Sequence, residues 1–185
     1  MTRPSAPVAI AVVLPLLLAL VVAGIGVVAR LRGADGSDPA PPDTRPLAVV
    51  PIDAPEASSP SCTSLLAGLD GDLPADGATL PRRALAAPAP AGVRAWAAAP
   101  EPAVLRCGLP RPAELTPTAA LLEIDGVRWL QLDDGTPNPQ ALTYVAVDRP
   151  VYVVLTVPTG VGSAPLQAVS DTVRTTLPAA PVVVR

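Results

Sequence analysis

The stretch LLEIDGVRWLQL, residues 121–132, decides the fold. Two β-prone runs flank Asp125-Gly126, a dipeptide that favours the type I′ turn of a two-residue β-hairpin. In that register each residue before the turn pairs with the residue at the same distance after it, and successive pairs alternate between the two faces. The predicted pairs are Ile124 with Val127, Glu123 with Arg128, Leu122 with Trp129 and Leu121 with Leu130.

Similar signals extend to both sides of this hairpin. Residues 103–107, 141–148 and 151–157 are rich in apolar and β-branched side chains and are predicted to be strands. Residues 61–69 and 163–177 each begin with a serine suited to cap a helix, and the residues that follow place apolar side chains on one face at helical spacing. The sequence therefore predicts an α+β domain in which two helices pack on one face of a small antiparallel sheet.

Residues 8–29 carry no charge and lie between arginines at positions 3, 30 and 32. A helix of that length covers the hydrocarbon core of a bilayer, about 30 Å thick, so we expect an N-terminal transmembrane helix. A cleaved signal peptide is the alternative, although its apolar region is usually shorter, about 7–15 residues. Membrane contact is therefore expected through a single span over residues 8–29.

Two cysteines, Cys62 and Cys107, both follow this segment. They are too far apart in sequence for a C-x-x-C redox or metal pair. One disulfide in an oxidising compartment outside the cytoplasm is the preferred interpretation, and two buried thiols in a cytosolic domain are the alternative. We therefore expect a single-pass protein of the cell membrane with its C-terminal domain outside the cytoplasm.

The predicted organisation has three parts. Residues 1–32 form the anchor, and residues 33–60 form a Pro-rich linker with a short strand at 47–52. Residues 61–185 form the extracytoplasmic domain.

Composition excludes several classes of function. The chain of 185 residues has no histidine, so catalytic triads that contain histidine and histidine-ligated zinc sites are excluded. A net charge of −3 and an aromatic content of 2% argue against nucleic acid as a partner. The acids at positions 70, 72 and 76 and the turn-rich loop 133–139 resemble cation loops only loosely, and solvated loop positions explain them better. We expect no metal and no cofactor.

The chain resembles an actinobacterial family of membrane-anchored extracytoplasmic proteins of unknown function. The likeness is carried by a cysteine at the start of a Leu-rich helix, by Trp96, by the Leu-Arg-Cys-Gly step at 105–108 and by the Gly-Val-Arg-Trp step at 126–129. It covers most of the chain from about residue 47 onward. The resemblance implies a location in the cell envelope, supports the disulfide and supplies no activity.

The predicted function is that of a non-catalytic cell-envelope protein whose outer domain binds an envelope protein or a wall component. Trp96, Arg106, Arg128 and Trp129 are the candidate binding surface, and no catalytic residue is expected. Two alternatives stay open. One is a sensor in which Trp96, Trp129 and Arg106 line a small-ligand pocket, and the other is an envelope hydrolase that uses two carboxylates.

Overall fold

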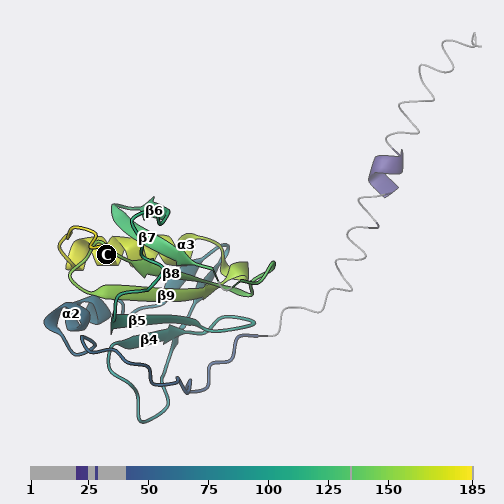
Figure 1. The fold of residues 1–185 in the computed structure, drawn as a ribbon. Helices are drawn as coiled ribbons and strands as arrows, with labels where there is room; N and C mark the ends of the chain where they lie inside the picture. Colours follow the sequence, from purple (N-terminus) through teal and green to yellow (C-terminus); the bar gives the residue numbers. More distant parts are fainter. Residues whose placement is uncertain (1–19, 25–27, 29–40, 134, 185) are drawn as a thin grey trace, which may run out of the picture. The chain divides into compact units, whose positions relative to one another are not determined.

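The computed structural model describes residues 20–24, 28, 41–133 and 135–184 (Figure 1). The chain divides into two compact units, Met1–Ala40 and Pro41–Arg185. In the first unit, residues 20–24 are helical and exposed. Within the described residues, no helix is both long enough and apolar enough to cross a membrane. The described part of the predicted transmembrane helix over residues 8–29 gives no such span, and most of that range lies outside the described residues.

The second unit is built on a seven-stranded sheet (Figure 1). Its neighbouring strands are all antiparallel. In spatial order the strands are β3 (Arg82–Arg83), β4 (Val93–Trp96), β5 (Ala103–Leu109), β9 (Tyr152–Pro158), β8 (Ala141–Ala146), β7 (Val127–Leu132) and β6 (Leu121–Ile124). A separate hairpin joins β1 (Leu73–Ala75) to β2 (Ala78–Leu80). The predicted fold class is therefore corrected to a mostly β fold with a few short helices, because the sheet is much larger than the sequence indicated.

The two helices of this unit, α2 (Pro60–Gly68) and α3 (Ala164–Thr176), share one core with a single face of the sheet. A short 3-10 turn, η1 (Thr159–Val161), leads into α3. The cap of helix α2 is Ser59, two residues before the predicted cap Ser61, because the Ser59 hydroxyl accepts a hydrogen bond from the backbone N–H of Cys62 and Pro60 suits a first helical position. The shared core includes Cys62, Leu65, Leu105, Val153, Leu155, Val169 and Val173.

The hairpin over residues 121–132 has the predicted register. Asp125 and Gly126 have φ angles of 51° and 74°, as a type I′ turn requires. Val127 and Trp129 are buried on the helix face, whereas Leu122 remains 44% exposed because β6 is the edge of the sheet.

The sheet face opposite the helices, here called the outer face, is only partly covered. At one end, a second apolar cluster forms from Leu115, Leu130, Val145 and Val147, and Val182 of the C-terminal segment packs against it. Further along β5, β9 and β8 the outer face carries half-buried residues such as Thr156. Two cavities lie over this uncovered part of the sheet.

Part of the predicted linker belongs to the folded unit, which begins at Pro41. Leu47 forms an isolated parallel bridge with Leu85, and the rest of the predicted strand over residues 47–52 has no strand partner among the described residues. Further on, the backbone N–H of Glu56 donates to the carbonyl oxygen of Gly108 at 3.1 Å. Residues 33–40 of the predicted linker lie outside the described residues.

Candidate functional site

The predicted disulfide between Cys62 and Cys107 is confirmed. It joins α2 to β5, and both cysteines are almost fully buried. The bond therefore fastens the helical layer to a strand in the interior of the sheet.

Two residues of the predicted binding surface lie in the core instead. Trp96 and Trp129 are both 0% exposed, because their strand positions face the helices. Each indole N–H has an internal acceptor at 2.9 Å, the carbonyl oxygen of Gly71 for Trp96 and the hydroxyl of Ser170 for Trp129. Neither ring can reach an external ligand, so both are structural residues.

The two arginines of the predicted surface lie apart. Arg128 is exposed on the β6–β7 hairpin, 3.8 Å from the carboxylate of Glu123. Arg106 lies on the outer face of β5, where its Nη2 donates to the carbonyl oxygen of Val50 at 3.1 Å. Because Trp96 and Trp129 lie on the opposite face, the pocket proposed for a sensor does not form from Trp96, Trp129 and Arg106.

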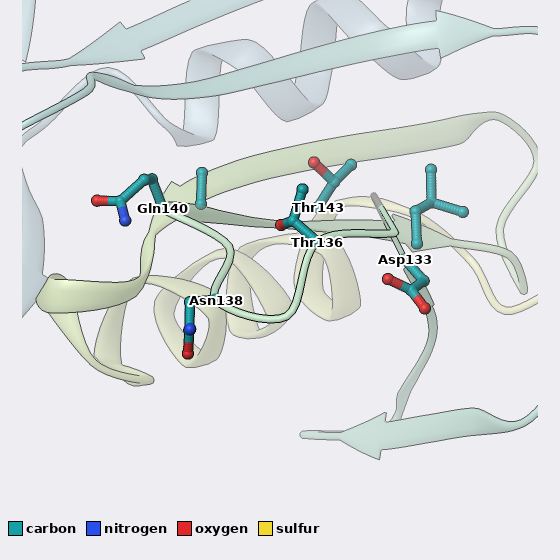
Figure 2. A pocket seen from close by; sticks show the side chains of 7 residues that line it. Asp133, Thr136, Asn138, Gln140 and Thr143 are labelled. Carbon is teal, nitrogen blue, oxygen red and sulfur yellow. The ribbon is translucent and has the colours of Figure 1, made fainter.

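The outer face carries a cavity of about 610 Å³ where β7 leads into β8 (Figure 2). We call it the amide cavity because two side-chain amides belong to it. Figure 2 shows its polar side chains spread along the loop and the adjoining strand. Its lining residues are Leu132, Asp133, Thr136, Asn138, Gln140, Ala141 and Thr143. The carboxylate of Asp133 also accepts a hydrogen bond from the backbone N–H of Gly135, which holds the loop in a turn.

A second cavity, of about 310 Å³, lies over β5 and β9. We call it the charged cavity because it contains one acid and one base. Its lining residues are Glu101, Pro102, Val104, Arg106, Ala141, Val154 and Thr156. Burial lowers the pKa of Arg106, but an arginine remains cationic under all ordinary conditions.

The two cavities are neighbours and together form what we call the outer site. Ala141 lines both. The hydroxyls of Thr143, in the amide cavity, and Thr156, in the charged cavity, are 3.0 Å apart and share a hydrogen bond. The strand order β5-β9-β8 places these residues side by side although they are distant in sequence.

The chemistry of the outer site suits recognition of a polar ligand. Amides and hydroxyls offer neutral donors and acceptors, and the aliphatic side chains between them give apolar contact. Within the described residues, each of these two cavities is lined by one carboxylate, Asp133 in one and Glu101 in the other.

Two of the loop acids considered as cation ligands have structural partners for their carboxylates. Asp70 forms an ion pair with Arg82, and the carboxylate of Asp72 accepts from the backbone N–H of Arg82 at 2.8 Å. Asp76 donates its backbone N–H to the carbonyl oxygen of Val161. Among the residues that the structure describes, no group of three or more Cys, Asp or Glu side chains is placed to hold a metal ion.

The binding residues predicted from the sequence include Arg106 but none of the other residues that line the outer site. The polar loop 133–139 was the one signal that pointed to the amide cavity, and it was assigned to a turn. Thr143 and Thr156 gave no signal, because each occupies an ordinary position in a β-branched strand.

Comparison with known proteins gives one match. No curated protein and no solved structure matches the chain. The model of the family described as "Protein of unknown function (DUF3515)" matches residues 12–182. This match spans most of the chain and includes both cysteines and every residue of the outer site. The chain therefore belongs to the DUF3515 family.

Proposed function

We propose that this protein is a non-catalytic binding protein that works outside the cytoplasm and recognises a protein or a wall component of the cell envelope through its outer site. The observation that carries the proposal is the joined pair of cavities, whose lining combines amides, hydroxyls, two carboxylates, one guanidinium and aliphatic side chains. Such a set of groups binds and orients a polar ligand.

The buried disulfide supports the location. Disulfides persist in oxidising compartments and are rare in the cytosol, where thiols are kept reduced. Cys62 and Cys107 are buried at the junction of α2 and β5, and no described cysteine is free. Quenching intact cells with acid and then denaturing the protein in the presence of a thiol-alkylating reagent tests the oxidation state, because denaturation exposes both buried cysteines. We expect neither cysteine to be labelled, and labelling of both would contradict an extracytoplasmic location.

Site-specific photocrosslinking in intact cells tests the binding function. A photoreactive amino acid replaces Gln140, which lines the amide cavity and is exposed. The control places the same amino acid at Gln167, an exposed position on α3, which packs on the other face of the sheet.

We expect position 140 to give one reproducible adduct, which mass spectrometry identifies as an envelope protein or a wall fragment. Position 167 should not give this adduct. The same adduct from both positions, or none from position 140, would overturn binding at the outer site.

A further inference from the structure

The charged cavity is lined by two opposite charges, Glu101 and Arg106, that do not form an ion pair with each other. Glu101 is exposed at its rim, and Arg106 is half-buried. The ion pairs of the described residues include neither side chain. Two unpaired charges around one cavity are the arrangement expected where a ligand supplies both counter-charges.

Arg106 is suited to receive an anion. A guanidinium carries several N–H donors, and the contact from Nη2 to Val50 uses one of them. Partial burial weakens the hydration of this cation. A carboxylate that approaches the remaining donors would therefore gain charge-assisted hydrogen bonds.

The floor between the two charges is apolar and small. Val104 and Val154 lie on adjacent strands, and Pro102 adds a further aliphatic surface. A cavity of about 310 Å³ is at the lower end of the range for ligand sites. It is large enough to accept a short aliphatic group.

The threonine pair adds a donor. When the hydroxyls of Thr143 and Thr156 share a hydrogen bond, one hydroxyl hydrogen is used and the other remains available. When Thr143 is the donor, the available hydrogen is that of Thr156, which lines the charged cavity, so it can reach an oxygen atom of a ligand held there.

We infer that the charged cavity binds a zwitterionic amino-acid unit. Its carboxylate contacts Arg106, its ammonium contacts Glu101, and its aliphatic part lies on Val104 and Val154. The inference rests on the proposed function and gives it a ligand class, since the adjoining amide cavity would hold the neutral remainder of a longer envelope component.

Titration of the purified full chain with four small probes, followed by NMR, tests the inference. Alanine and dialanine are zwitterions, whereas N-acetylalanine lacks the ammonium and alaninamide lacks the carboxylate. We expect a zwitterion to bind and the loss of either charge to weaken binding by about tenfold or more. Stronger binding of alanine would indicate a free amino acid, and stronger binding of dialanine would indicate a short peptide.

Charge-neutralising variants test whether Arg106 contacts the ligand's carboxylate and whether Glu101 contacts its ammonium. Arg106→Gln and Glu101→Gln should each weaken binding of the zwitterion by about tenfold. Arg128→Gln and Glu123→Gln remove a similar pair of charges from the exposed hairpin and should leave binding unchanged.

Two results would overturn the inference. One is equal binding of all four probes or of none, and the other is equal binding by the Arg106→Gln variant and the unaltered chain. Neither result bears on the proposed function, which is tested by the adduct formed from position 140 in the other cavity.

Discussion

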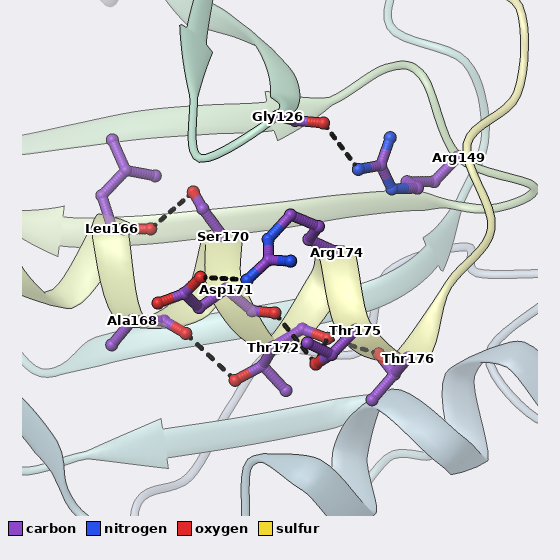
Figure 3. A network of polar contacts seen from close by, with 10 residues as sticks. All are labelled: Gly126, Arg149, Leu166, Ala168, Ser170, Asp171, Thr172, Arg174, Thr175 and Thr176. Carbon is purple, nitrogen blue, oxygen red and sulfur yellow. Dashed lines mark hydrogen bonds and ion pairs between the residues drawn. The ribbon is translucent and has the colours of Figure 1, made fainter.

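Arg149 reaches from the β8–β9 connection to the turn of the β6–β7 hairpin, where its Nη2 donates to the carbonyl oxygen of Gly126 at 2.8 Å (Figure 3). Its Nη1 donates to the backbone carbonyl of Asp148 at 2.8 Å and lies 2.9 Å from the Asp148 carboxylate. The side chain is 2% exposed. One buried guanidinium therefore joins two turns that are not adjacent in sequence.

Replacement of Arg149 by lysine should lower the free energy of unfolding by about 2–3 kcal/mol, because a single ammonium cannot reproduce the planar set of donors. Urea denaturation measures the change. Arg174→Lys is the control, since Arg174 is exposed and its guanidinium pairs with Asp171 of the same helix. It should change stability by less than about 0.5 kcal/mol. Equal effects of the two substitutions would contradict a clamping role for Arg149.

A buried hydrogen-bond chain on α3 gives the second prediction. Trp129 donates to the hydroxyl of Ser170. This hydroxyl donates in turn to the carbonyl oxygen of Leu166 at 2.7 Å (Figure 3). Ser170→Ala leaves the indole N–H without an acceptor and should cost about 1–3 kcal/mol. Thr175→Ala removes an exposed hydroxyl from the same helix and should cost less than about 1 kcal/mol. Thermal unfolding followed by near-UV circular dichroism compares the two, and a cost for Ser170→Ala no larger than that for Thr175→Ala would contradict the prediction.

The parts of the fold that the sequence predicted are those specified by local chemistry. Asp125-Gly126 requires positive φ angles, so its hairpin and register could be predicted without knowledge of the rest of the chain. Helix α3 has a regular apolar face that includes Leu166, Val169 and Val173. Strands β1 to β4 were missed, because they are only two to four residues long and β1 to β3 lie in a segment broken by Gly and Pro. Their pairing depends on distant partners.

The candidate site could not be predicted, because it depends on strand order. Trp96 and Trp129 were assigned to a surface, yet the side of the sheet that the helices cover places both in the core. Arg106 and Thr156 line one cavity because β9, close to the C-terminus, pairs with β5. A single sequence does not specify that neighbour.

Gly108 gives the third prediction. Its φ is +85°, and a Cβ there would lie 2.3 Å from the backbone nitrogen of Ala57 and 2.3 Å from the carbonyl carbon of Glu56. Gly108→Ala therefore combines an unfavourable backbone conformation with a clash against main-chain atoms, and should cost about 2–3 kcal/mol. Gly71→Ala is the control, because its Cβ would meet no atom within 4 Å. Urea denaturation of both variants measures the difference, and similar midpoints would show that residues 56 and 57 move aside at little cost.

The disulfide gives the last prediction. Cys62 and Cys107 are separated by 45 positions, and opening a loop of that size should cost about 4 kcal/mol in the chain-entropy model, with about 2–4 kcal/mol typical of measured cases. The double variant Cys62→Ala with Cys107→Ala, compared with the unaltered chain by urea denaturation, measures this cost. A reductant should destabilise the unaltered chain and leave the double variant unchanged. If the double variant were as stable as the oxidised chain, the contacts of α2 with the sheet would hold this junction without the bond, and the bond would serve another purpose than stability.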